Sequence, residues 1–299
     1  CHQNPSAATG WRAWPSIDPY EPDCLHHVIR LTWQKQNTRR MRGKTTTAAA
    51  ALFALIFGAP LITGCTNPLA ISYFSSGVEK HEKGDYQGAI ADYTKALEIN
   101  PQDADSYENR GAAKDELEDF QGAIADLNKA LQIDPESVIA YFNRGNTKSS
   151  LGDYQGAITD YTKVLQIDPA YEGAHINRGI AKHGISDYKG AISDFSKAIK
   201  INPSNATSYS NRGYMKSMLK DNQDAISDYN KAIEINPQYA DAFANRGLAK
   251  SELKDYQGAI TDYDKAIEID PQNSNAYINR GISRELINDL AGACGDWRK

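Results

Sequence analysis

From Ala70 onward, one pattern of apolar and polar positions repeats every 34 residues. In each repeat, two stretches carry apolar or small side chains three and four positions apart, the spacing of an amphipathic helix. We number the repeats so that Gly111 is position 8 of the repeat that begins at Ala104. The pattern then predicts helix A over about positions 1–14 and helix B over about positions 17–30, packed as a pair.

Single positions within the repeat support these boundaries. Glycine at position 8 and alanine at position 20 let the two helices approach closely, and bulky side chains at positions 4 and 24 fill the space around them. Aspartate at position 16 is placed to cap helix B, and proline at position 32 ends it. One helix pair cannot bury its own apolar stripe, but stacked pairs can. We therefore predict seven repeats, at 70–103, 104–137, 138–171, 172–205, 206–239, 240–273 and a shortened 274–299.

The 34-residue period, with its glycine, alanine and proline in register, resembles the tetratricopeptide repeat (TPR) family. The resemblance covers residues 70–299. It implies an all-α solenoid, a right-handed superhelix of stacked antiparallel helix pairs. It also implies a protein or an extended peptide as partner, bound in the concave groove that the A helices line in this family.

The tripeptide Asn-Arg-Gly occurs six times and places arginine at position 7, on the face of helix A that packs inside the solenoid. An unpaired charge there would cost several kcal/mol. Position 23 of helix B is aspartate in every repeat and offers a partner, either within a repeat or in the repeat before. The first repeat keeps Asp92 but has Ser76 at position 7, and no repeat precedes it. We therefore predict structural pairs between each aspartate and the next repeat's arginine: Asp92–Arg110, Asp126–Arg144, Asp160–Arg178, Asp194–Arg212, Asp228–Arg246 and Asp262–Arg280.

Two alternatives stay open for this arginine row, since the side chains could reach into water or bind a ligand. Lysine at position 11 is present in the first repeat as Lys80, whereas the arginine is not, so we do not assign the lysines to the same pairs. We expect these lysines to extend along the surface toward solvent.

The opposite face of helix A carries asparagine at position 6 in six repeats. An amide both donates and accepts, so a ladder of amides can bind the main chain of an extended peptide of any sequence. The row resembles the asparagine ladder of some superhelical TPR proteins, although local hydrogen bonding is an equal alternative. Apolar neighbours would supply specificity, unless the molecule's own chain covers them. The predicted groove residues are Asn109, Asn143, Asn177, Asn211, Asn245, Asn279, Phe142, Ile176, Tyr214, Leu248 and Ile278.

A possible export signal precedes the repeats, between Met41 and Cys65. Arg42 and Lys44 are followed by an apolar stretch, 48–62, that is short for a membrane-spanning helix. It ends in Ile-Thr-Gly-Cys, which resembles a bacterial lipobox. The resemblance implies a signal peptide over 41–64, lipidation of Cys65, a lipidated linker over 65–69 and a lipid-anchored place on the periplasmic or extracytoplasmic side of the cell envelope. An uncleaved anchor and an ordinary cleaved signal are alternatives. We interpret residues 1–40 as upstream or disordered sequence.

The charge of the chain and the absence of known catalytic motifs disfavour several classes of function. The net charge is -5, and the first 64 residues are basic, so the repeats are acidic and a nucleic-acid partner is disfavoured. The sequence has no phosphate-binding Gly-Lys-Ser/Thr loop, no His-Glu-x-x-His pair, no Gly-x-Ser-x-Gly elbow and no metal-ligand spacing of cysteines. We expect a non-enzymatic interaction scaffold without cofactor or metal. The alternatives are a recruitment module of an enzyme whose catalytic domain lies beyond Lys299, and self-assembly through the ends of the solenoid.

Overall fold

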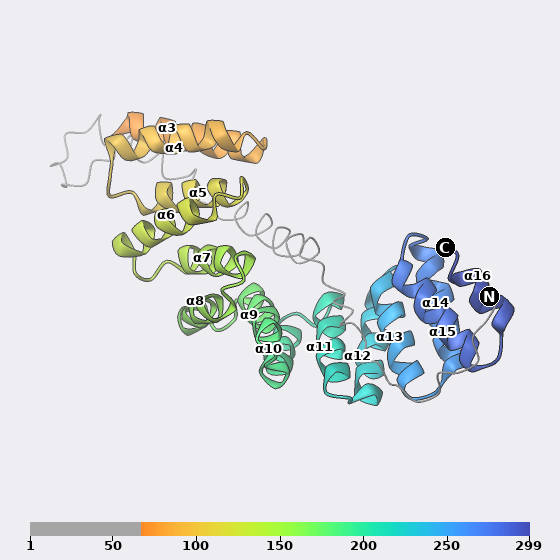
Figure 1. Cartoon of the computed structure of the whole chain (residues 1–299). Helices are drawn as coiled ribbons and strands as arrows, with labels where there is room; N and C mark the ends of the chain where they lie inside the picture. The colour runs from red at the N-terminus through yellow and green to blue at the C-terminus, as the bar shows by residue number, and fades with distance from the viewer. Residues whose placement is uncertain (1–66) are drawn as a thin grey trace. The chain divides into compact units, whose positions relative to one another are not determined.

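The computed structural model describes residues 67–299, and this part of the chain is helical without strands (Figure 1). The A helices are α3 (Pro68–Glu82), α5 (Ala104–Asp115), α7 (Val138–Ser150), α9 (Glu172–Gly184), α11 (Ala206–Met218), α13 (Ala240–Glu252) and α15 (Ser274–Leu286). The B helices are α4 (Tyr86–Ile99), α6 (Phe120–Ile133), α8 (Tyr154–Ile167), α10 (Tyr188–Ile201), α12 (Asn222–Ile235), α14 (Tyr256–Ile269) and α16 (Leu290–Asp296). The predicted fold class, stacked antiparallel helix pairs, is confirmed.

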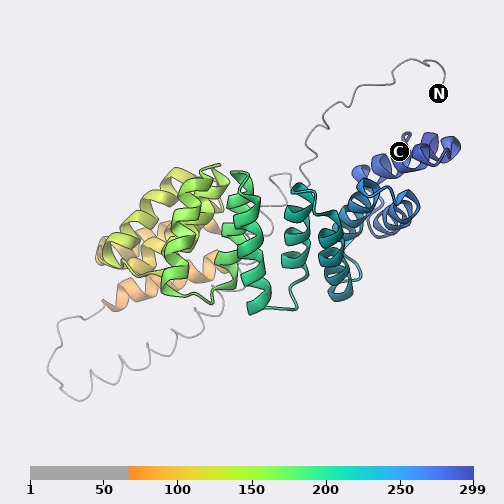
Figure 2. The same cartoon turned by 90° about the horizontal axis from the view of Figure 1, so that it is seen from below.

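The described residues form two compact units, and the boundary falls inside α9, between Asn177 and Arg178. We call residues 67–177 the N-terminal unit and residues 178–299 the C-terminal unit. Consecutive helices pack against each other from α3 to α8 in the N-terminal unit and from α10 to α16 in the C-terminal unit (Figures 1 and 2). The A helices of successive repeats also touch, α3 with α5 and α5 with α7 in one unit, and α11 with α13 and α13 with α15 in the other.

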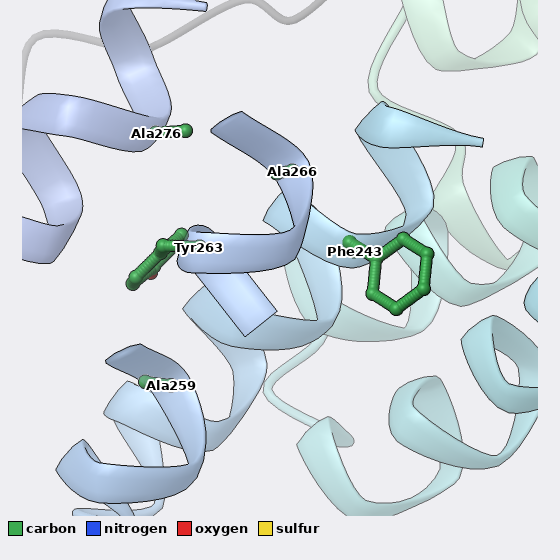
Figure 3. Packing of buried hydrophobic residues seen from close by; sticks show 5 residues of the cluster. All are labelled: Phe243, Ala259, Tyr263, Ala266 and Ala276. Atoms are coloured by element: carbon green, nitrogen blue, oxygen red, sulfur yellow. The ribbon is translucent and has the colours of Figure 1, made fainter. Parts of the chain in front are cut away.

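Small and large side chains alternate in the core, as the repeat pattern predicts. The alanine at position 20 is fully buried in all seven repeats. Figure 3 shows this packing around Tyr263 of α14, which is fully buried with Ala259 and Ala266 of its own helix and Ala276 of α15. Gly247 of α13 faces the same ring, and a Cβ at that glycine would lie 2.9 Å from the Tyr263 Cε1 atom. The glycine is therefore required for the close approach of α13 and α14.

Most B helices begin with the predicted aspartate cap. The position-16 carboxylate accepts a hydrogen bond from the backbone N–H of position 19 in six repeats: Asp85, Asp119, Asp153, Asp187, Asp255 and Asp289. Position 19 is glycine in these six repeats, and a Cβ at Gly156 would overlap the Asp153 carboxylate. Repeat five has Asp224 at position 19, and Asp221 makes no such bond. Among the B helices, the bond thus forms in the six repeats with glycine at position 19, although the A helices make the same kind of bond to Ser208 and Ala276.

No helix within residues 67–299 is long and apolar enough to cross a membrane. The predicted signal peptide and Cys65 lie outside the described residues.

Candidate functional site

The repeated arginine is held in a fork by the aspartate of its own repeat. In the third repeat, Arg144 Nη2 lies 2.6 Å from Asp160 Oδ1, and Arg144 Nε donates to Asp160 Oδ2 at 2.9 Å. Only 2% of the Asp160 side chain is exposed, so the pair lies in the interior. The same two bonds join Arg110–Asp126, Arg178–Asp194, Arg212–Asp228, Arg246–Asp262 and Arg280–Asp296.

The prediction that arginine faces the interior is thus confirmed, but the predicted partners are wrong. Asp92–Arg110, Asp126–Arg144, Asp160–Arg178, Asp194–Arg212, Asp228–Arg246 and Asp262–Arg280 are not the pairs that form. The reason is geometric. Positions 7 and 23 lie eight residues before and after position 15, at the turn, so antiparallel helices of one repeat bring them to the same level.

The third nitrogen of the arginine reaches the preceding repeat instead. Nη1 donates to a side-chain oxygen at position 25 of the preceding B helix: Arg110 to Thr94, Arg144 to Asn128, Arg212 to Ser196, Arg246 to Asn230 and Arg280 to Asp264. The sequence analysis missed this row of acceptors, although every repeat that precedes an arginine has Thr, Ser, Asn or Asp there. No described repeat precedes the first one, where Ser76 Oγ donates to Asp92 Oδ2 at 2.6 Å in place of arginine.

Lysine at position 11 completes the cluster. Lys148 Nζ lies 2.8 Å from Asp160 Oδ2, and equivalent bridges recur in the other repeats, with Arg284 in the last. We predicted that these lysines extend along the surface toward solvent. They instead form ion pairs with the buried aspartates. Burial opposes ionisation of Asp92, but hydrogen bonds from Lys80 and Ser76 bring the pKa of this carboxyl below its usual value. The hydrogen bond to Asp228 likewise raises the pKa of Arg212, against the effect of burial.

An aromatic ring covers the arginine on its remaining side. The guanidinium carbon of Arg144 lies 5.4 Å from the ring centre of Tyr141, three residues earlier on the same helix. The same contact occurs at Arg110, Arg212, Arg246 and Arg280. A cation over such a ring adds about 0.5–1 kcal/mol at an exposed site and more when desolvated. The guanidinium is thus engaged by the carboxylate, the preceding repeat and the ring, so we assign it a structural role.

The predicted groove asparagines of the N-terminal unit do not form an open ladder, and two of them make hydrogen bonds within the unit. Asn109 Nδ2 donates to the backbone oxygen of Asp105, the local bonding considered above. Asn177 Nδ2 donates at 2.9 Å to Asn146 Oδ1, and that oxygen also accepts from Tyr161. Asn143 is buried without a role that the structure explains.

Two predicted anchors of the same unit are also buried. Phe142 is 2% exposed and Ile176 is 3% exposed. The Phe142 ring packs against the rings of Tyr161 and Tyr171, with centres 5.9 and 5.0 Å apart. These two residues therefore offer no open surface for an anchor, and they act instead in packing.

The A helices of the C-terminal unit expose apolar side chains on the predicted face. Met218 of α11 is 41% exposed, and Ile278 and Leu286 of α15 are 46% and 55% exposed. Tyr214 and Leu248 are half-buried, and Ile282 lies one turn from both Ile278 and Leu286. We call Tyr214, Met218, Leu248, Ile278, Ile282 and Leu286, with the ladder residues Asn211, Asn245 and Asn279, the C-terminal A-helix face.

A buried acceptor lies within this face. Asn279 is 8% exposed, and its Oδ1 accepts no hydrogen bond from any residue in the described part of the chain. An unsatisfied buried acceptor costs about 1–3 kcal/mol.

The family models give a direct comparison with known sequences. Models described as TPR repeat match residues 77–114, 116–149, 185–217 and 219–254. Models described as tetratricopeptide repeat match residues 138–171, 240–273 and 262–295. A comparison with curated protein sequences gives no significant match.

Solved structures of repeat proteins resemble the chain over most of their own length. YrrB, described as a TPR protein with an unusual peptide-binding site, is 26% identical with a TM-score of 0.54, over 62% of this chain and 95% of YrrB. The MamA protein is 27% identical with a TM-score of 0.53, over 57% of this chain and 93% of MamA. A tetratricopeptide repeat protein from Parabacteroides merdae shares the fold, at 19% identity and a TM-score of 0.63, over 78% of this chain and 92% of that one.

The helix pairs, their 34-residue period and these matches agree, and TPR proteins of this kind are interaction scaffolds that typically carry no catalytic site. The chain belongs to the tetratricopeptide repeat family.

Proposed function

We propose that this protein is a lipid-anchored scaffold that binds an extended, apolar peptide segment of a partner on the C-terminal A-helix face. The observation that carries the proposal is the exposure of Met218, Ile278 and Leu286 there. Side chains of this size cost free energy when they stay in water, at about 25 cal/mol for each Å² of apolar surface. Large apolar side chains exposed on one face are typical of surfaces that a partner covers.

Asparagine side chains give the same face a means of holding a peptide main chain. The half-buried amide of Asn245 can both donate to and accept from the backbone of an extended ligand. Such a bond does not depend on the ligand's sequence, so specificity would come from the apolar neighbours. The similarity to YrrB, itself described as having a peptide-binding site, supports a peptide as the ligand class.

Selection of peptides from a random library against the full chain, followed by fluorescence anisotropy, tests the proposal. Met218→Glu and Leu286→Glu should each weaken binding of the selected peptide at least roughly tenfold, since a charge would replace a buried apolar contact. Leu253→Glu is the matched control. Leu253 is 47% exposed but lies at position 14, outside this face, so its variant should bind normally. Equal loss in all three variants, or in none, would refute the site.

The membrane anchor is a separate part of the proposal and rests on the resemblance of residues 62–65 to a lipobox. Two or more acyl chains at Cys65 would hold the repeats stably at a membrane surface. A role in assembling or positioning envelope proteins follows from that location and from the binding face together.

A further inference from the structure

The outer surface of α10 differs from that of every other B helix. Positions 18, 26 and 29 of its repeat are Lys189, Lys197 and Lys200, and all three side chains are exposed. Lys189 and Lys200 lie about 20° apart around the helix axis and Lys197 lies about 80° from Lys189, so the three form one stripe. We call these residues the α10 lysine stripe.

The other repeats serve as an internal comparison because they carry a different pattern at the same positions. Position 18 is Gln or Ala, position 26 is Lys, and position 29 is Glu or Gln wherever the chain includes it. The lysine at position 26 contacts the residue at position 29 in three repeats, with Lys231–Glu234 at 2.7 Å, Lys265–Glu268 at 2.8 Å and Lys129–Gln132 at 3.1 Å. The lysines of the stripe make no ion pair with any residue between 67 and 299. The attractive Lys–Glu pair of α12 and α14 is thus absent from α10.

Two of these replacements act against the stability of α10. Lys189 is the second residue of the helix, where a cation opposes the positive end of the helix dipole. Lys197 and Lys200 are three residues apart, so two like charges replace the attractive pair. Lys200 lies in the last turn, where a cation is favourable, and offsets only part of this cost. Residues that destabilise their own helix are expected at functional positions.

The neighbouring charges indicate the shape of the partner. The next B helix of the same unit, α12, has exposed Asp224 in its first turn and Glu234 near its end. A broad anionic surface such as a membrane would meet these carboxylates as well as the lysines. A narrow acidic segment lying along α10 would contact only the stripe, which spans about 16 Å along the axis.

We propose that the α10 lysine stripe is a second interaction surface, which binds a short acidic segment of a partner protein. This surface is on a B helix and uses charge, so it is separate from the apolar A-helix face. A partner could therefore engage the scaffold at two chemically different places, or two partners could bind at once.

Binding of a fluorescein-labelled decaglutamate peptide to the full chain, followed by anisotropy at low salt, tests the proposal. Decaglutamine of the same length is the control probe. The double variant K189Q/K200E gives α10 the Gln, Lys and Glu found in α12 and α14. It should weaken decaglutamate binding roughly tenfold, through two lost contacts and one added repulsion. Its melting temperature should not fall, since K189Q removes an unfavourable cation from the first turn and K200E exchanges a favourable last-turn cation for an attractive pair between Lys197 and the introduced glutamate, so loss of binding cannot be ascribed to unfolding.

A transplant gives the converse test. Gln257→Lys with Glu268→Lys installs the stripe on α14 and should restore decaglutamate binding to the K189Q/K200E protein. Met218→Glu, on the A-helix face, should leave decaglutamate binding unchanged, so the two proposals fail independently. Unchanged decaglutamate binding in K189Q/K200E would overturn the inference. So would absence of binding in the original chain, or binding of phosphatidylserine vesicles through these lysines without binding of the peptide.

Discussion

Arg144 joins three parts of the molecule through one side chain. It bonds Asp160 of its own repeat and Asn128 of the preceding one, and it lies over the ring of Tyr141. A buried charge is tolerated when its hydrogen bonds are satisfied and its counter-charge is close. The arginine of Asn-Arg-Gly recurs because it makes one ion pair within its repeat and one hydrogen bond to the preceding repeat.

Removing the carboxylate should show how much this arrangement contributes to the stability of the fold. Asp160→Ala leaves Arg144 and Lys148 close together without their counter-charge, and we expect it to lower the free energy of unfolding by about 3–5 kcal/mol. Urea denaturation followed by circular dichroism measures the change.

A double-mutant cycle then identifies the partner. Arg144→Leu and Asp160→Leu should show a coupling of about 1–3 kcal/mol. The same cycle between Asp160 and Arg178, the pair expected from the sequence, should give a coupling near zero. A large coupling to Arg178 would mean that the structure assigns the wrong partner.

At the scale of single helices, the start of helix B is capped by aspartate at position 16. In the six repeats where the cap bond forms, position 19 is glycine. Repeat five keeps Asp221 but has Asp224 in place of the glycine, and its cap bond is absent. The sequence pattern predicted seven equal caps, because it considered the aspartate without the second carboxylate, Asp224, three residues downstream in repeat five.

Repeats three and five therefore provide a matched pair. Asp153→Ala should cost about 1 kcal/mol, the usual contribution of an N-cap. Asp221→Ala should cost clearly less, since only the interaction of its charge with the helix dipole is lost. Midpoints of urea denaturation compare the two variants, and equal losses would contradict the absence of the cap bond in repeat five.

At the scale of the whole molecule, the lipobox resemblance and the binding face together give the proposed scaffold its location and its partner. Lipid attached through Cys65 would contribute about 0.8 kcal/mol for each methylene buried in the bilayer. The acidic repeats would gain little from an anionic membrane surface, so the anchor would have to supply the attachment.

Expression in a bacterium with fractionation of the cells tests the anchor. The original chain should sediment with membranes, and Cys65→Ser should move it to the soluble fraction. Cys24→Ser, which changes a cysteine ahead of the predicted signal, should leave it with the membranes. Release of both variants, or of neither, would contradict lipidation at Cys65.

The residue pattern was sufficient for most properties that depend on neighbours along the chain, although it did not foresee the missing cap at Asp221. Periodicity placed the helices, the small residues at position 8 and position 20 marked the close contacts, and the face assignment put arginine in the interior. Such properties follow from helical geometry and side-chain size, which are local. Which aspartate meets which arginine was settled by the antiparallel packing of one repeat, and that could have been derived from the equal distances to the turn.

The exposure of the face residues could not be derived in the same way. Phe142 and Ile176 were chosen by the same rule as Ile278, yet the first two are buried and the third is 46% exposed. All three occupy position 5 of an A helix, so their own helices cannot distinguish them. The difference arises from residues elsewhere in the fold, such as Tyr171, at the end of the same repeat, against Phe142, and contacts between residues far apart in sequence exist only once the chain is packed.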